Sequence, residues 1–575
     1  MLEWAIDLEA NTQPLDYMVW AWGAAKICEN PENSFLHGET IAELVDFCAS
    51  TGGRFWFHNL AYDGKFVISH LLETGWVWVH DRPGKGQFST TIDKMGRFYK
   101  IELKGDKTAV FADSMKKIPM SVRAVAATYK LEYSKGELDY DTVREKGHKL
   151  TDKELDYLRR DVLIMAHAMH IRLQMGTKLT TGADCLASYK DLIGSYTFMA
   201  NFPKLNAIVD AAIRRAYRGG FVYVSEKYRG KDVGHGMRID NNSLFPWALY
   251  TKELPYGTPV YGKGQYKQDD RYPLWVGEIT FTAHLKKDGI PTIQMRNSMF
   301  YADREYITDT VEPVTLWVSS VDWELINDMY DVSVYGYIQY YKFKAKTGMF
   351  DDYIEIGMDG KIHATTAGER LNFKLWLNNL YGKMGQKIDC TGKKPVLDTE
   401  DGIVHYVTDR KEERDPVYIP VAVFVTAYAR ELTVRTAHKF GDRYIYSDTD
   451  SVHFLGSDIP DGVEIHESKL GAFKVEAEFV RARFIRPKTY AEEVIKKDGT
   501  TKCEFVCAGM SDGLKSVMEF DDFKEGFTTD ISKGEVKEKY LDTNLWKLKP
   551  RSVPHGVILE PVPFTIHATK KKEVS

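Results

Sequence analysis

The sequence predicts a multidomain α/β protein. At 575 residues the chain is too long for one compact core, because domains usually hold about 100–200 residues. Strand-like and helix-like segments alternate over residues 1–180, residues 252–349 are rich in short strand-like runs, and residues 353–385 return to a helical pattern. This change of pattern along the chain predicts several units, each with its own core.

The first unit is predicted from two strand-like runs, WAIDLE (4–9) and RFWFHN (54–59), and from a well-marked helix. Thr151 and Glu154 form a capping box, after which apolar residues recur to Met169. A new unit is expected to begin with a helix in TTGADCLASYKDL (180–192), where small residues precede the apolar ones.

Later segments are predicted from turn signals. Residues 393–408 form two strand-like runs around Glu400-Asp401-Gly402, which predicts a hairpin. Beyond residue 525 the chain is rich in Lys and Pro and ends in short strands around Pro554-His555-Gly556.

Composition excludes some classes of protein. The sequence has no run of about 18 consecutive apolar residues, so it predicts no membrane span. Its first residues lack the basic and apolar regions of a secretory signal. The six cysteines are scattered, which predicts free thiols in a reducing cytoplasm and no zinc site. The net charge of −5 does not by itself indicate a nucleic-acid binder.

Two aspartates stand close together in YIYSDTDSVHF (444–454). Asp448 and Asp450 are two residues apart, so a strand would present both on one face. An ordinary polar turn is the alternative, since Asp, Ser and Thr are common turn residues. Asp240, at the end of a short strand-like run in GMRIDNNSLFPWALY (236–250), is a third candidate. Three such carboxylates would suit Mg²⁺, which binds a few carboxylates together with substrate phosphates.

A possible positive partner lies in RLNFKLWLNNLYGKMG (370–385). Lys374, Asn378 and Tyr381 are spaced i, i+4, i+7 and would share one helix face. A lysine for phosphates beside an aromatic ring for a base is what a nucleoside triphosphate requires. A solvated lysine on an amphipathic helix explains the same pattern.

Four motifs, IDNNSLFP, KLWLNNLYG, YSDTDS and PKTY (487–490), resemble in sequence and order the polymerase motifs of family B DNA polymerases. Phe245 stands where most relatives carry Tyr, and its ring should still exclude a 2′-hydroxyl. Asn241 stands where an apolar residue is commoner, a mild change if only its backbone carbonyl meets the metal. The resemblance implies that Asp240, the Asn241 carbonyl and Asp450 bind metal, with Asp448 beside them. It also implies that Lys374 binds the triphosphate and that Phe245, Asn378 and Tyr381 form the nucleotide pocket. Lys488 and Tyr490 would contact the primer end.

A second set of acidic residues lies in the first unit. Asp7 and Glu9 share one face of a strand, while the pairs Asn59 with Asp63 and Tyr157 with Asp161 are each spaced i, i+4. Each pair alone is weak evidence for a metal site, because most such pairs are ordinary solvent-exposed side chains. Their joint order resembles the three motifs of the 3′→5′ proofreading exonuclease of family B enzymes. The resemblance implies two metal ions on Asp7, Glu9, Asp63 and Asp161, a water oriented by Tyr157, a scissile phosphate touched by Lys135, and a single-stranded 3′ end held by Asn59 and Tyr62.

Between the two sets lies YRGGF (217–221). Gly219 and Gly220 would let the backbone approach DNA closely, and Arg218 beside Tyr217 could meet a phosphate, although a plain turn gives the same letters. The motif resembles a linker of protein-primed family B polymerases, and the likeness to the strand-displacing replicases of small Bacillus phages runs through nearly the whole chain. Ala10, where the family usually has Thr, predicts a looser contact to the terminal nucleotide.

The resemblance also implies an architecture and partners. An RNase H-like (DEDD) exonuclease domain (1–180) would precede a right-hand polymerase. The partners implied are primer-template and single-stranded DNA, deoxynucleoside triphosphates and a terminal protein primer, and no membrane. The protein would be a monomer or a heterodimer with the terminal protein. It would act in the cytoplasm of a phage-infected bacterium. Two Mg²⁺ ions are implied at each site, with Mn²⁺ able to substitute. The implied polymerase parts are palm (181–251 and 417–524), fingers (350–385), thumb (525–575) and two terminal-protein-region insertions (252–349 and 386–416), the second giving processivity and strand displacement.

Two other functions stay open from the residues alone: a two-metal nuclease with a degenerate polymerase half, and a DNA-binding scaffold without catalysis. A second cation for the triphosphate also stays open, with Lys361 and Arg370 as candidates.

Overall fold

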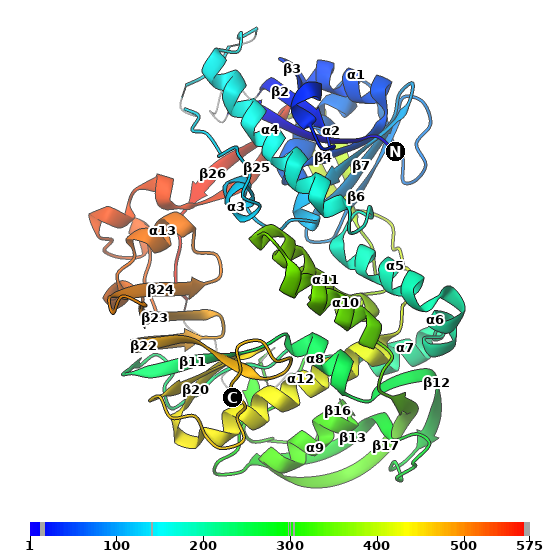
Figure 1. Cartoon of the computed structure of the whole chain (residues 1–575), viewed down its shortest axis with the longest axis vertical. Helices are drawn as coiled ribbons and strands as arrows, with labels where there is room; N and C mark the ends of the chain where they lie inside the picture. Colours follow the sequence, from blue (N-terminus) through cyan, green and yellow to red (C-terminus); the bar gives the residue numbers. More distant parts are fainter. Residues whose placement is uncertain are drawn as a thin grey trace.

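The computed structural model describes residues 1–11, 18–139, 142–145, 147–296, 298, 301–302 and 305–567. An N-terminal unit, at the top of Figure 1, is built on a mixed sheet covered by helices α1 (Ile41–Thr51), α2 (Leu60–Glu73), α3 (Val122–Thr128) and α4 (Asp152–Leu173). The strand order of this sheet is β3 (Leu36–Gly38), β2 (Val19–Lys26), β1 (Glu3–Ala10), β4 (Gly53–Phe57), β8 (Thr108–Asp113), β7 (Phe98–Lys104), β6 (Gln87–Ile92) and β5 (Val77–Trp78).

The three central strands of this sheet run parallel. In the register of β1, β4 and β8, Ile6 lies beside Phe57 and Phe57 beside Asp113. The carboxyl ends of these strands therefore meet at one edge, where α2 and the loops begin. The predicted capping box of α4 is confirmed, because the Thr151 side chain accepts from the Glu154 N–H and Glu154 reaches back to the Thr151 N–H.

A second sheet, the central sheet, lies at the lower left of Figure 1. All its pairings are antiparallel, and β10 (Asp232–Val233) pairs with β22 off the main path. The long helix α12 (Ile419–Lys439) packs against it and is almost wholly buried. The main strand order is β24 (Thr501–Cys507), β23 (Thr489–Ile495), β22 (Phe473–Arg486), β11 (Gly236–Asn241), β21 (Ser451–Leu455), β20 (Tyr444–Asp448) and β9 (Val222–Val224).

The stretch 252–349 is strand-rich, as predicted. Its sheet has the order β12 (Leu254–Lys263), β17 (Tyr330–Lys346), β13 (Leu274–Leu285) and β16 (Val314–Ser319). Helix α9 (Ser320–Met329) packs on this sheet and on α12, and a small pair, β14 (Ile293–Gln294) with β15 (Tyr306–Ile307), completes the segment.

The predicted helical stretch 353–385 is two helices, α10 (Asp351–His363) and α11 (Ala367–Met384), which pack side by side at the centre of Figure 1. The hairpin predicted at 393–408 is confirmed as β18 (Lys393–Leu397) with β19 (Val404–Thr408). The short strands predicted around Pro554-His555-Gly556 are β25 (Lys547–Val553) and β26 (Gly556–Val562), which pair as a second hairpin.

These two hairpins return to the N-terminal unit. Val404 and Val557 are buried in the same apolar core as Phe66 of α2. The His80 Nδ1 atom lies 2.8 Å from Asp409 Oδ2, and the His555 Nδ1 atom lies 3.0 Å from Glu73 Oε2. The last third of the chain thus packs back against the first, as the red and blue segments of Figure 1 show.

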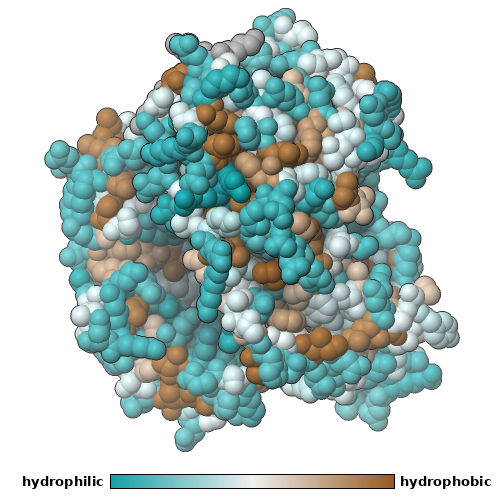
Figure 2. Space-filling model, turned by 45° about the horizontal axis from the view of Figure 1, so that its top comes forward, coloured by the Kyte–Doolittle hydropathy of each residue, from teal (hydrophilic) through white to brown (hydrophobic). Residues whose placement is uncertain are grey.

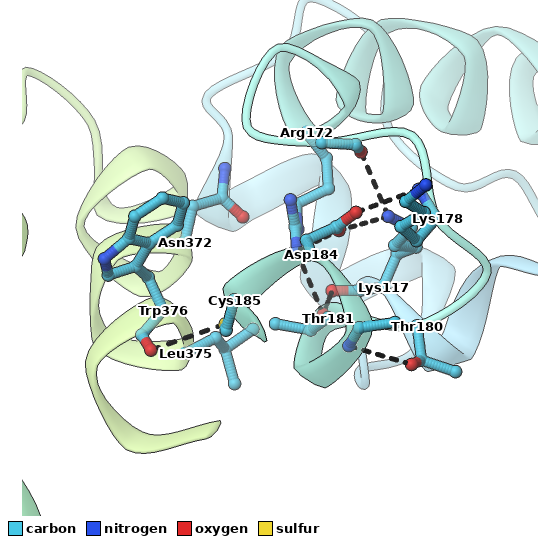
Figure 3. Close-up of polar contacts among 12 residues, drawn as sticks. Lys117, Arg172, Lys178, Thr180, Thr181, Asp184, Cys185, Asn372, Leu375 and Trp376 are labelled. Atoms are coloured by element: carbon cyan, nitrogen blue, oxygen red, sulfur yellow. Dashed lines mark hydrogen bonds and ion pairs between the residues drawn. The ribbon is translucent and has the colours of Figure 1, made fainter. Parts of the chain in front are cut away.

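Helices α5 (Thr181–Ile193), α6 (Ser195–Asn201) and α7 (Ala207–Arg214) connect the N-terminal unit to the rest. At this joint Lys117, Arg172 and Asp184 form a buried ionic group, with exposed side-chain fractions of 0%, 2% and 1%. The Asp184 carboxylate contacts the Lys117 ammonium and lies 3.3 Å from Arg172 Nη2 (Figure 3). Burial lowers the pKa of Lys117 to about 8 despite the Asp184 carboxylate.

The surface of Figure 2 is mostly hydrophilic and is hollowed on its left side, between the region of β22–β24 and α13 (Asp512–Val517) and the central pair α10–α11. Among the described residues, none of the helices has the length and apolar character needed to cross a bilayer.

We predict that Lys117→Met lowers the free energy of unfolding by about 3 kcal/mol, because removing one partner leaves the buried Asp184 charge undercompensated. Urea denaturation followed by circular dichroism measures this change. Lys85→Met is the matched control, since Lys85 pairs with Asp106 at 2.9 Å on the open surface. An equal response of the two variants would contradict a structural role for the buried group.

Candidate functional site

The first carboxylate cluster consists of Asp240, Asp448 and Asp450. Asp240 lies in β11, which pairs with β21 so that Asp240 is opposite Ser451, next to the loop between β20 and β21. The Asn241 N–H donates to the Asp450 carbonyl at 2.8 Å. Asp240 therefore lies beside Asp448 and Asp450 at the end of the central sheet, although it precedes them by some two hundred residues in the chain.

Their proximity changes their acidity. Burial, and next the Asp450 carboxylate, raise the pKa of Asp240 to about 7. Burial also raises the pKa of Asp450, with Asp448 adding to it and Lys374 opposing it. A nearby positive charge favours the ionised form of carboxyl groups whose pKa is raised in this way, and a bound divalent cation would be the largest such charge.

Lysines surround this cluster. Lys488 Nζ lies 2.7 and 2.9 Å from the two carboxylate oxygens of Asp448, and Lys474 Nζ lies 3.8 Å from Asp240 Oδ2. Lys374, exposed on α11, lowers the pKa values of Asp240 and Asp450 through its charge. The predicted pairing of α11 with the aspartates is therefore present in the fold.

An aromatic pair lies beside these charges. Phe245 in α8 (Leu244–Thr251) stacks on Tyr381 of α11, with ring centroids 4.1 Å apart and planes 29° apart. Burial raises the pKa of Tyr381, to which the nearby Tyr217 hydroxyl and Asp450 contribute. Asn378 is half-buried on the same helix, one turn from Tyr381.

Lys361 and Arg370 also lie at this end of α10 and α11. The Lys361 ammonium is 3.3 Å from Ser243 Oγ, and burial together with the charges of Arg370, Lys374 and Lys474 lowers its pKa. Four cations thus gather opposite the carboxylates, which is the electrostatic environment that a polyphosphate requires.

The PKTY segment forms the turn between β22 and β23. The Lys488 N–H donates to the Tyr446 hydroxyl at 3.0 Å, and that hydroxyl donates to Asp448 Oδ2 at 3.2 Å. Tyr490 packs against Tyr446 and Phe484, with centroids 5.2 Å away in each case. Lys488 therefore contacts Asp448 directly, and Tyr490 lies one residue further away, packed on the Tyr446 ring.

The second carboxylate cluster consists of Asp7, Glu9, Asp63 and Asp161. Asp7 and Glu9 come from β1, Asp63 from the first turn of α2 and Asp161 from α4. Burial, and next the Asp161 carboxylate, raise the pKa of Asp7 to about 7, while burial and Asp7 raise the pKa values of Glu9 and Asp63. Asp161 Oδ1 is buried without a hydrogen-bond partner among the described residues, so the residues present fit a cation.

The other residues predicted for this cluster lie around it. Lys135 Nζ is 2.5 Å from Asp161 Oδ2 and 5.3 Å from the centre of the Tyr157 ring. Asn59 precedes α2 in the left-handed region at φ 81° and is exposed, and Tyr62 packs edge-on against Phe66.

The YRGGF segment makes contacts within the chain. A Cβ atom at Gly220 would come within 2.6 Å of the Thr449 side chain, so this glycine is required by the hairpin loop. Gly219 has open space around it, and the Arg218 guanidinium lies 3.5 Å from the Trp317 carbonyl. Contacts of this segment with DNA stay a prediction.

Several residues at the two clusters were not found from the sequence. Lys474 and Glu476 reach the first cluster only through the register of β22 beside β11. Asp113, at the end of β8, raises the pKa of Asp63 and accepts from the Asn59 N–H at 3.2 Å. Its only sequence signal is a strand-like run that ends in Asp.

A buried charged chain also supports β11 and β21. Glu492 accepts from Arg238 at 2.6 Å and lies 2.7 Å from the fully buried His453. Residues on three different strands make this chain, so the sequence offers no signal for it.

Comparison with known proteins agrees with this geometry. The family described as DNA polymerase type B, organellar and viral, matches residues 47–150 and 144–464. The DNA polymerases of Bacillus phages M2 and phi29 are each 37% identical to the chain; the M2 match covers 97% of this chain and 98% of the relative, and the phi29 match 98% of each. The solved structure of phi29 DNA polymerase with primer-template DNA and incoming nucleotide superposes with a TM-score of 0.91 at 36% identity, over 98% of this chain and 100% of that one. The chain therefore belongs to the viral and organellar type B DNA polymerases, and within them to the group of phi29-like enzymes of Bacillus phages.

Proposed function

We propose that this polymerase extends a DNA primer at the first carboxylate cluster and removes misincorporated nucleotides in the 3′→5′ direction at the second. The observation that carries the proposal is the convergence of Asp240, Asp448 and Asp450 opposite the cations of α10 and α11. A non-catalytic scaffold needs neither cluster, and a nuclease alone needs only one.

At the first cluster, Asp240, Asp450 and the Asn241 backbone carbonyl would hold two divalent ions, Mg²⁺ with Mn²⁺ able to replace it. Such ions, when bound, favour ionisation of the primer hydroxyl and neutralise the leaving pyrophosphate. Lys374 binds the triphosphate, with Lys361 and Arg370 beside it. Asn378, Phe245 and Tyr381 form the nucleotide pocket.

The primer terminus is positioned by the turn beside Asp448. Lys488 and Tyr490 hold the primer strand, since Lys488 contacts this aspartate and Tyr490 packs on the neighbouring Tyr446 ring. Orientation of this kind lowers the barrier because the reacting groups no longer need to find each other in solution. Gly219 and Arg218, beside Tyr217 and Gly220, would contact the DNA backbone between the two sites.

At the second cluster, Asp7, Glu9, Asp63 and Asp161 would hold two further divalent ions, which supply hydroxide near neutral pH. Tyr157 orients the attacking water and Lys135 contacts the scissile phosphate. Asn59 and Tyr62 hold the frayed 3′ end, the tyrosine by stacking on a base whatever its sequence.

We further propose protein priming and strand displacement in the cytoplasm of an infected bacterium. Residues 252–349 and 386–416 would be the terminal-protein regions, and the exonuclease, palm, fingers and thumb would follow the boundaries expected above. Support for closure around DNA comes from the packing of β19 and β26 on the core of the N-terminal unit. Such a closed path would keep the polymerase on its template and separate the displaced strand.

We expect Asp448→Asn to reduce primer extension with Mg²⁺ by at least about a hundredfold, the scale on which loss of one charge-stabilising group slows an enzyme. Degradation of single-stranded DNA should stay unchanged, because Asp448 belongs to the other cluster. Asp63→Asn is the reciprocal variant, which should lose degradation and keep extension. Parallel loss of both activities in either variant would contradict two separate sites.

We expect Phe245→Val to increase ribonucleotide incorporation relative to deoxynucleotide by about 10- to 200-fold, because the smaller side chain opens room for a 2′-hydroxyl. Single-nucleotide insertion kinetics with matched ribo- and deoxynucleotides measure the ratio. Phe245→Tyr keeps the ring and should keep the selectivity. An unchanged ratio in the valine variant would remove Phe245 from the nucleotide pocket.

Protein priming is tested by supplying the cognate terminal protein and labelled deoxynucleoside triphosphates without an oligonucleotide. We expect covalent attachment of the nucleotide to a hydroxyl-bearing side chain of that protein, detected as a labelled band resistant to denaturation. An oligonucleotide-primed reaction in parallel shows that the enzyme is active. Extension of the oligonucleotide without labelling of any cognate terminal protein would contradict protein priming.

A further inference from the structure

The loop that joins β20 to β21 is strained. It has two residues, Thr449 and Asp450, and Thr449 has φ +67°. A β-branched residue rarely adopts positive φ, because its side chain crowds the backbone. The Asp450 N–H donates to the Asp448 carbonyl at 2.8 Å, which makes a three-residue γ-turn centred on Thr449, and a γ-turn with positive φ is rare and strained. Something outside the loop must therefore hold Thr449 in place.

Hydrogen bonds from two other segments hold the backbone of this residue. The Thr449 N–H donates to the Phe221 carbonyl at 2.7 Å, and the Thr449 carbonyl accepts from the Thr433 hydroxyl at 2.7 Å. The next residue, Asp450, accepts from the Asn241 N–H at 2.8 Å. The loop is thus tied to the linker before β9, to α12 and to β11.

The side chain of Thr449 is confined as well. Gly220 lies so close that a Cβ atom there would be 2.6 Å from Thr449 Cγ2. The Gly220 backbone therefore limits the space on one side of the Thr449 side chain, while the Thr433 hydroxyl of α12 binds the Thr449 carbonyl. Rotation toward an ordinary φ would move the Thr449 carbonyl relative to its N–H, so the bonds to Thr433 and to Phe221 could not both be kept.

The Thr433 hydroxyl is unusual for a buried threonine in a helix. Such hydroxyls commonly bond to a carbonyl of their own helix, one turn back. Thr426 does this in α12, donating to Ala422 at 3.0 Å and to Val423 at 3.1 Å. Thr433, with an exposed fraction of 0%, instead donates across to the loop that carries the aspartates.

We propose that Thr433 is a positioning residue of the polymerase site: its hydroxyl holds Thr449 at positive φ, so that Asp448 and Asp450 face Asp240. The inference rests on the proposed function of these three carboxylates. Thr433 touches neither substrate nor metal, and it acts only through the backbone of the loop.

The test compares Thr433→Val, which keeps the shape and removes the donor, with Thr433→Ser, which keeps the donor. Primer extension by the valine variant should fall about tenfold, equivalent to ~1.4 kcal/mol in the barrier. The Mg²⁺ concentration for half-maximal extension should rise, and degradation of single-stranded DNA should stay unchanged. The serine variant should retain wild-type extension. Thr426→Val is the matched control and should leave extension unchanged.

A second readout does not depend on catalysis. Amide hydrogen exchange should accelerate in Thr433→Val within residues 447–451, whose N–H groups are protected by the loop hydrogen bonds, and not elsewhere in the central sheet. This measurement tests whether the Thr433 hydroxyl holds the loop (the Thr433 clamp), even if primer extension depends on residues other than those proposed. Should Asp448→Asn extend primers normally while exchange accelerates in Thr433→Val, the proposed function fails and the clamp stands.

The sharpest test combines Thr433→Val with Thr449→Gly. Glycine adopts positive φ without steric cost, so the loop no longer needs the hydroxyl, and the double variant should extend primers better than Thr433→Val alone. A loss that is the same whichever residue stands at 449 would overturn the proposal. So would equal losses in Thr426→Val, or a parallel fall in degradation, which would indicate general destabilisation of the fold.

Discussion

Repulsion between carboxylates is the constraint on which the rest of the molecule depends. Two sites each gather at least three acidic side chains in partly or fully buried positions, where like charges raise one another's pKa. Left alone, such groups would separate or take up protons. The fold holds them together through rigid strands and pairs them with lysines, of which Lys488 and Lys135 are in direct contact.

The two clusters solve this problem with different sheets. In the N-terminal unit, β1, β4 and β8 run parallel, so that their carboxyl ends bring Asp7, the start of α2 and Asp113 to one edge. In the central sheet, the strands are antiparallel, and a tight hairpin projects Asp448 and Asp450 beside the end of β11. The second arrangement needs a strained loop, which other segments hold in place. The cluster in the N-terminal unit therefore depends on strand topology, and the cluster in the central sheet depends in addition on hydrogen bonds of the loop with Phe221, Asn241 and Thr433.

Long-range contacts fix the positions of the sites relative to one another. The buried Lys117, Arg172 and Asp184 group sits where the N-terminal unit meets α5. Tyr129 of the N-terminal unit donates to Asn372 of α11 at 2.9 Å, and a Cβ atom at Gly368 would collide with the Tyr129 ring. The helix that carries Lys374 therefore packs directly on the unit that carries the second cluster. The C-terminal strand β26 also packs on α2, which ties the end of the chain to the N-terminal unit.

The sequence by itself determined the mixed α/β class, the capped helix at Thr151 and the hairpin at 393–408, because these follow from local pattern and spacing. The members of both carboxylate clusters were identified by the resemblance of their motifs to those of family B polymerases, since spacing alone does not bring distant segments together. The sequence did not determine Lys474, Glu476 or Asp113 as neighbours of those clusters, nor the Arg238–Glu492–His453 chain, nor the bond from Thr433 to Thr449. The contacts between strands depend on which strands pair and in which register, over separations from 39 residues for His453 and Glu492 to 254 for Arg238 and Glu492. The bond from Thr433 depends instead on how α12 packs against the loop between β20 and β21. Only the tertiary structure decides such contacts, since local propensity carries no information about distant pairing.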